Sequence, residues 1–137
     1  MATITLNRKV LIKVIVSQEF KDSFIKQLEV LISEIKTNIE KLKSEESKLL
    51  LNVGSSFSAQ ELGNIRARIS KERESQETAK KEIENKINEV KNLEIGTLYP
   101  YASIDGTVDI KEGDNLWEKL NGSEITVRDG IVISIKT

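Results

Sequence analysis

The sequence predicts an α+β protein, in which a long antiparallel α-helical hairpin, a coiled-coil stalk, is inserted into a small β-barrel or β-sheet module. Two patterns predict this fold. Apolar residues at heptad spacing fill residues 17–96, and β-branched runs separated by turn residues fill both flanks. The flanking strands must pair with one another, so we expect a β module of residues 1–16 plus 97–137 and a hairpin of residues 17–96.

The N-terminal flank has the composition of β structure. Residues 10–16 are rich in Val and Ile and have the length of a strand, and Ile4 and Leu6 suggest an edge strand before it. Ser17 is a suitable N-cap for the first helix, because its hydroxyl can accept a hydrogen bond from a first-turn N–H.

Both arms of the hairpin carry an apolar seam with alternating steps of three and four, the a/d pattern of a heptad. In the first arm the seam comprises Ile25, Leu28, Ile32, Ile35, Ile39, Leu42 and Leu49. In the second arm it comprises Leu62, Ile65, Ile69, Ala79, Ile83, Val90 and Leu93. Polar residues interrupt both seams, namely Glu46 in the first arm and Glu72, Gln76 and Lys86 in the second.

Antiparallel pairing of the two seams sets Ile35 and Ile39 opposite Gln76 and Glu72. An apolar row packs poorly against a polar row, which leaves two interpretations. Either the polar residues fix the register at some cost in stability, or the two isoleucines pack on a second copy of the hairpin. We favour self-association through Ile35 and Ile39, because a lone helix pair has little core of its own.

The connection between the arms is marked by turn and capping signals. Residues 52–54, which end in a glycine, are predicted to terminate the first helix. Ser58 and Glu61 have the spacing of a capping box at the start of the second helix. Phe57 and Leu62 occupy the positions of a hydrophobic staple, so a tight helical turn is expected here.

The C-terminal flank begins after Gly96, which we expect to stop the second helix. The single proline predicts a turn at residues 98–101, and a strand is expected at residues 107–111. Residues 116–120 fit either one helical turn or a bent segment. The strongest β signal follows, since two alternating runs flank Asp129-Gly130, a sequence typical of a type I′ hairpin turn.

The composition excludes several chemistries. The chain has no His and no Cys, which removes the usual zinc ligands and the Ser-His-Asp and Cys-His nucleophile systems. No phosphate-binding or nucleophile-elbow glycine spacing is present. We therefore expect no catalytic residue, no cofactor and no metal site, and a protein that is not an enzyme.

The acidic residues of the C-terminal flank do not match the spacing of an EF-hand loop. We interpret them as solvated turn and sheet positions, with a weak divalent-ion site as the alternative. They are Asp105, Asp109, Glu112, Asp114 and Glu118.

Charge and hydropathy bound the location and the partners. Net charge is −1, which is not the basic balance of a dedicated nucleic-acid binder. The start of the chain has no charged segment followed by an apolar one, and the apolar run at residues 10–16 is too short to span a bilayer. We expect a cytoplasmic protein with no membrane contact.

The densest basic stretch comprises Arg66, Arg68, Lys71 and Arg73, with glutamates interleaved. Alternating charge along a helix usually marks a solvated, ion-paired face. A weak contact with RNA or the ribosome is the alternative, although no stacking aromatic residues accompany the stretch. Trp117, the only tryptophan, is interpreted as a core anchor of the β module or, alternatively, as an exposed contact for a partner.

The C-terminal flank carries the most distinctive pattern, which combines residues 106–108 (GTV), 111–116 (KEGDNL), 118–120 (EKL) and 127–132 (VRDGIV). This pattern resembles the end of YlqD family proteins, most closely the cyanobacterial branch. Residues 10–16 followed by a long charged helix are similar to the start of that family. The resemblance implies no established activity. Gene neighbourhood in that family suggests a role around ribosome assembly.

Two hypotheses follow for function. The first is a non-enzymatic module for protein interaction or self-association, which contacts a protein partner or a second copy through the helical hairpin. The alternative is a ribosome- or RNA-associated accessory factor in ribosome assembly that uses the basic stretch. Phosphate contacts would make such binding sensitive to salt.

Overall fold

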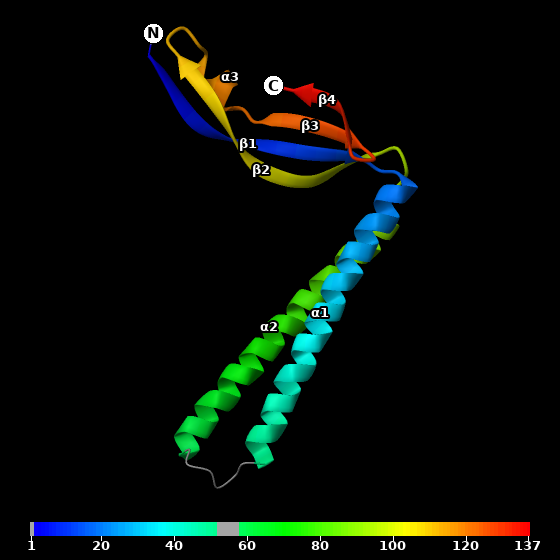
Figure 1. Cartoon of the computed structure of the whole chain (residues 1–137), viewed down its shortest axis with the longest axis vertical. Coiled ribbons are helices and arrows are strands. Elements are labelled where there is room, and N and C mark those ends of the chain that lie inside the picture. Colours follow the sequence, from blue (N-terminus) through cyan, green and yellow to red (C-terminus); the bar gives the residue numbers. More distant parts are fainter. Residues whose placement is uncertain (1, 52–57) are drawn as a thin grey trace. The chain divides into compact units, whose positions relative to one another are not determined.

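The computed structural model describes residues 2–51 and 58–137, and the chain has an α+β fold (Figure 1). The elements in chain order are β1 (Thr3–Ile15), α1 (Gln18–Leu51), α2 (Ala59–Lys91), β2 (Leu98–Lys111), α3 (Leu116–Leu120), β3 (Ser123–Arg128) and β4 (Ile131–Lys136). Two compact units result. One contains Met1–Asp22 and Leu93–Thr137, and the other contains Ser23–Asn92.

The first unit is built on a four-stranded sheet in the order β2-β1-β3-β4. Strand β1 is antiparallel to β2 and parallel to β3, and β3 is antiparallel to β4. The prediction that strands from both ends of the chain pair in one module is therefore confirmed. Because β2 and β4 remain edge strands, the sheet of the described residues is open, and the barrel form is not confirmed.

Strand β2 is longer than the sequence predicts. The turn expected at residues 98–101 is wrong, because β2 runs from Leu98 through Pro100 to Lys111. Proline lacks an N–H group, but an edge strand tolerates it where that position needs no ladder bond. The register against β1 shifts between Ile12 and Lys13, so an irregularity opposite these residues accommodates this segment of β2.

Strand register divides the sheet into two chemically different faces, because residues paired across strands point to the same side. On one side, which we call the apolar sheet face, lie Ile4, Leu6, Val10, Ile12, Val14, Tyr99, Ala102, Ile104, Val108, Ile110, Ile125, Val127, Val132 and Ile135. Arg8 is the charged residue that the same register places on this face.

The opposite side, the polar sheet face, holds the cross-strand ion pairs and hydrogen bonds. Lys9 forms an ion pair with Asp105, and the Lys13 ammonium lies 3.1 Å from the carboxylate of Glu124. The hydroxyl of Thr5 donates to Asp109 over 2.7 Å. Both neighbours of β1 therefore contribute charge to this side of the sheet.

The ends of the sheet connect to its neighbouring segments through specific hydrogen bonds. The Val16 N–H donates to the carbonyl of Thr97, and the Gly96 N–H donates to the carbonyl of Val16. Ser17 caps α1, since its hydroxyl accepts from the Phe20 N–H over 3.0 Å, as predicted. The β3–β4 turn has positive φ at both Asp129 and Gly130, which confirms the predicted type I′ geometry.

The second unit consists of α1 and α2 lying antiparallel (Figure 1). All predicted seam positions of α1 are buried or half-buried, with Leu28 and Ile39 buried most completely. In α2 the buried residues are Ile69, Ile87 and Val90. Ile87 was not expected on the seam, although it flanks the predicted position 86.

The start of α2 is capped as predicted. The Ser58 hydroxyl accepts from the Glu61 N–H over 3.1 Å, and the Glu61 carboxylate accepts from the Ser58 N–H over 3.2 Å. This reciprocal pair satisfies two helix N–H groups. The predicted helix end at residues 52–54 and the staple residue Phe57 lie outside the described residues.

Candidate interaction surfaces

Three of the five carboxylates considered in the C-terminal flank are engaged in local structure. Asp105 and Asp109 face β1 residues across the sheet, and the Asp114 carboxylate accepts from the Lys111 N–H over 3.0 Å. Within residues 2–51 and 58–137, no group of three or more acidic side chains is placed to hold a metal ion. The geometry thus favours the turn and sheet interpretation of these residues.

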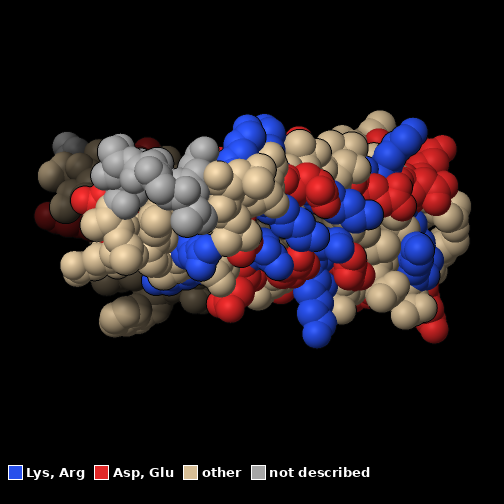
Figure 2. Space-filling model, turned by 90° about the horizontal axis from the view of Figure 1, so that it is seen from below, with Lys and Arg blue, Asp and Glu red and all other residues tan. Residues whose placement is uncertain are grey.

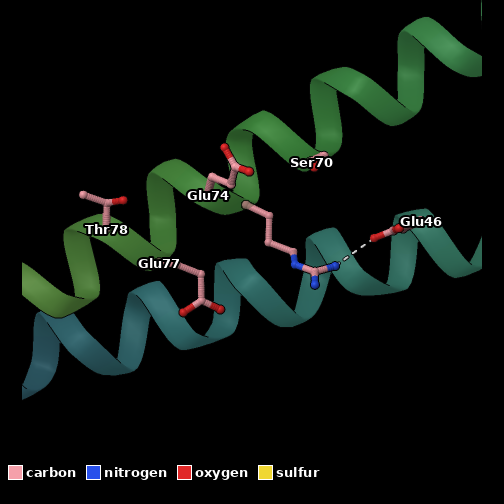
Figure 3. Close-up of a pocket in the computed structure, with 6 residues that line it drawn as sticks. Glu46, Ser70, Glu74, Glu77 and Thr78 are labelled. Carbon is pink, nitrogen blue, oxygen red and sulfur yellow. Dashed lines mark hydrogen bonds and ion pairs between the residues drawn. The ribbon is translucent and has the colours of Figure 1, made fainter.

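A polar site lies between the two helices of the hairpin. Arg73 of α2 reaches Glu46 of α1, and its Nη1 lies 2.9 Å from Oε2 of that carboxylate (Figure 3). Glu77 also points toward α1, whereas Glu74 and Thr78 do not. Glu46 interrupts the apolar seam of α1, and Arg73 is the half-buried polar residue of α2 that pairs with it.

This site corrects the predicted pairing of the seams. Glu72 was expected on the seam, but it is exposed, and Arg73 takes the half-buried position instead. A straight α-helix has 3.6 residues per turn, so its contact line drifts by one position relative to a strict heptad. The arginine's long aliphatic stem can pack along the seam while its guanidinium reaches the carboxylate.

The two isoleucines predicted to mediate self-association lie on the inner side of the hairpin. Ile39 is only 4% exposed, and Ile35 is half-buried. A second copy can reach Ile39 only if the two helices separate. Self-association through Ile35 and Ile39 therefore remains a prediction that requires an opened hairpin.

The basic stretch divides into one engaged residue and three exposed ones. Arg73 is held by Glu46, whereas Arg66, Arg68 and Lys71 are exposed and make no ion pair with the described residues. Figure 2 shows basic and acidic side chains interleaved on the face that it presents. These three cations are therefore available to a polyanion, but they do not form a continuous basic patch.

Helix α3 positions the single tryptophan outside the core. Asn115 caps the helix, since its side-chain oxygen accepts from the Glu118 N–H over 3.2 Å. Trp117 is 74% exposed, so the interpretation as a core anchor is wrong. Its exposure agrees with the alternative, a contact available to a partner.

The position of α3 relative to the sheet follows from Arg8. The guanidinium of Arg8 donates from Nη1 to the Lys119 carbonyl over 3.1 Å. Arg8 and Val108, both on the apolar sheet face, line a surface hollow together with Asn115 and Lys119. The helix thus stands at one end of that face. The ring of Phe20 lies at the other end, 6.0 Å from the ring of Tyr99.

Between these two ends the apolar sheet face is left open. Tyr99 and Val14 are buried, but Ile104 is 48% exposed and Ile135 is 65% exposed. The other exposed members of the face are Ile4 and Val132. Sequence reasoning missed this surface, because it emerges only when the registers of all four strands are combined.

No helix within the described residues is both long and apolar enough to cross a bilayer.

A family model described as YlqD protein matches residues 4–136. The crystal structure of a protein of unknown function from Synechococcus sp. WH 8102 has a TM-score of 0.85, covers 99% of this chain and 96% of that chain, and shares 22% sequence identity. At this identity the likeness shows a common fold. No match was found among curated proteins. The family match confirms the resemblance indicated by the C-terminal pattern.

Proposed function

The chain belongs to the YlqD family, and on that premise we propose that it is a non-enzymatic module for protein interaction or self-association. One observation carries the proposal. The apolar sheet face is open, and helix α3 at one end of it carries Trp117, which is 74% exposed. Soluble monomers rarely expose contiguous apolar surface of more than a few hundred Å², and exposed aromatic residues are frequent anchors of interfaces.

The available chemistry supports a binding role over a catalytic one. With no His or Cys in the sequence, the remaining reactive groups are carboxylates, lysines and hydroxyls. Several of the sheet's carboxylates and lysines already pair with one another across the polar sheet face. The cysteine-free sequence suits the reducing cytoplasm, where we propose that the protein acts.

The helical hairpin supports the proposal in a second way. Its apolar seam is mostly covered within one chain, whereas exposed apolar residues such as Val30 and Leu31 lie on the outer side of α1. A coiled coil between α1 and α2, with the outer surface open to a protein partner, is the arrangement that we propose for this unit.

A role as a ribosome- or RNA-associated factor is the second candidate. Its specific support is the unpaired state of Arg66, Arg68 and Lys71 among the described residues. Such cations can contact phosphates, and their binding would weaken steeply as salt rises. Interleaved glutamates on the same helix act against this candidate, so it ranks below protein interaction.

Gradient sedimentation of tagged full-length protein from its own cell lysate separates the two candidates. The lysate is run at low and high salt, with wild type beside Trp117→Ala and Arg66→Glu/Arg68→Glu. Migration in a larger assembly at both salt concentrations, reduced by Trp117→Ala, supports the interaction module. Ribosomal co-migration that vanishes at high salt and in the Arg66→Glu/Arg68→Glu variant supports the second candidate instead. Light fractions for wild type at both salt concentrations contradict the ribosome-associated candidate, and sedimentation equilibrium of the purified protein then tests self-association, because a dimer of this 15.4 kDa chain also stays in the light fractions.

A further inference from the structure

The apolar sheet face is large, open and nearly free of charge, and these properties together bear on what covers it. We infer that its occupant is a second copy of this chain, packed face to face to form a two-sheet sandwich. This inference rests on the proposed function and specifies its partner. It is independent of the earlier prediction for Ile35 and Ile39, which lie in the other unit.

Charge is the first argument for a second copy. The register places one charged side chain, Arg8, on the apolar sheet face, and its guanidinium already donates to the Lys119 carbonyl. Two such faces can meet without bringing like charges together at their centres. Homodimer interfaces are more apolar than interfaces between independently stable partners, and this face has the homodimer composition.

Size is the second argument. Adjacent strands lie about 4.8 Å apart and rise about 3.3 Å per residue. The four-strand centre and the β1–β2 ribbon beyond it therefore have a flat footprint on the order of 500 Å², from which the ends covered by α3 and Phe20 are to be subtracted. The accessible surface of its projecting side chains is larger than this footprint. Each partner of a standard interface contributes roughly 800 Å², so the face approaches the area that a stable dimer needs.

Shape is the third argument. It favours contact between two copies through the apolar sheet face over pairing of their edge strands. Strand β4 is exposed along its whole length, but its register against β3 shifts between Thr126 and Val127. A bulge of this kind bends a strand and discourages edge-to-edge pairing. Two copies of one twisted sheet, by contrast, share the same twist and can pack aligned, about 10 Å apart.

The test compares substitutions at adjacent positions that point to opposite faces. Ile104→Lys and Ile135→Lys place a charge on the apolar sheet face, at residues that are already 48% and 65% exposed in a single chain. Ser103→Lys and Ser134→Lys are the matched controls, one residue away on the polar sheet face. Sedimentation equilibrium of each full-length variant gives the dimer dissociation constant, and circular dichroism with thermal melting verifies folding.

We expect the wild type to be a dimer. Either isoleucine substitution should raise the dimer Kd at least ~100-fold, because an unpaired lysine buried in an interface is costly. Either serine substitution should leave the Kd nearly unchanged. A lysine on this face can also unfold the sheet, so a pair of cysteine variants, which perturb the fold less, provides a second measurement. The chain has no native cysteine, so Ile104→Cys and Ser103→Cys each carry one thiol. Maleimide should react more slowly with Cys at position 104, and dilution should abolish this protection.

Three results would overturn the inference, and they differ in what they say of the proposed function. A dimer that persists in both lysine variants indicates self-association through another surface, so the proposed function survives. A monomeric wild type that still joins a larger assembly in lysate indicates a different protein partner on the face. A monomeric wild type that joins no assembly removes the inference and the proposed function together.

Discussion

Arg73 of α2 and Glu46 of α1 meet across the helical hairpin, with 2.9 Å between Nη1 and Oε2. Each residue alone looks like a defect in an apolar seam. Together they form an ion pair, so neither charged group faces the interface between the helices without a partner. A shift of one turn would separate the two charges, so the pair makes a small contribution to the observed register of the two helices.

The ion pair should contribute little to stability. The two side chains are 40% and 39% exposed, so solvent screening limits their interaction to about 1 kcal/mol or less. We expect Glu46→Ala and Arg73→Ala each to lower the free energy of unfolding slightly, and Glu46→Leu/Arg73→Leu to raise it by extending the seam. Urea titration of the two alanine variants and of Glu46→Ala/Arg73→Ala gives the coupling energy of the pair, and titration of the double leucine variant measures the second effect, with the exposed Glu45→Ala as control. A double leucine variant less stable than wild type would contradict this account.

The hairpin illustrates what a single sequence can and cannot reveal. Heptad spacing located the inner positions of α1 correctly, including the polar position 46, because apolar periodicity records which side is buried. In α2 the same rule chose Glu72 over Arg73. Sequence spacing alone does not say where the contact line of a nearly straight helix drifts, and the partner of Arg73 lies far away in the chain.

The sheet illustrates a second limit. The strands at both ends and the Asp129-Gly130 turn were predictable from local composition and turn chemistry. The parallel pairing of β1 with β3 and the passage of β2 through Pro100 were not, because both depend on long-range strand order. The apolar sheet face, the main candidate site, requires all of that order before it can be seen.

The capping box at the start of α2 should have a measurable effect. Replacing Ser58 by Ala removes the acceptor for the Glu61 N–H, and loss of such a cap typically costs about 1 kcal/mol. Ser70, exposed in the interior of α2, is the matched control, because Ala there is neutral or slightly favourable. Thermal denaturation followed by circular dichroism compares the two. Equal melting temperatures for Ser58→Ala and Ser70→Ala would count against a role for the cap.

Two glycines should respond to alanine with opposite signs. Gly63 lies in α2, with nothing within 4 Å of an added Cβ, so Gly63→Ala should raise the stability by up to about 1 kcal/mol. Gly130 has a φ of +82°, and Gly130→Ala should cost roughly 1–2 kcal/mol through left-handed strain. Chemical denaturation of both variants provides the measurement. The explanation is wrong if both substitutions shift stability in the same direction.

Trp117 offers a direct spectroscopic check of the exposed helix α3. Because it is the only tryptophan, the intrinsic emission of the indole reports on this site alone. We expect red-shifted emission, strong acrylamide quenching, and a change in stability of no more than about 0.5 kcal/mol on Trp117→Ala. A core tryptophan would instead cost about 3–5 kcal/mol. A loss of that size, or emission protected from quencher in dilute protein, would restore the core-anchor interpretation.

Charge reversal in the basic stretch tests the RNA candidate without disturbing the hairpin. Arg66→Glu/Arg68→Glu changes two exposed residues that make no ion pair with the described part of the chain, whereas reversing Arg73 would break its contact with Glu46. If these cations contact single-stranded RNA, each phosphate contact contributes roughly −0.7 to the slope of log K against log salt. Filter binding across a salt series should then show weaker binding and a shallower slope for the variant. The exposed pair Lys36→Glu/Lys41→Glu on α1 makes the same four-unit change in net charge and is the control. An equal loss in that variant would assign the effect to overall charge and remove the specific support for RNA contact.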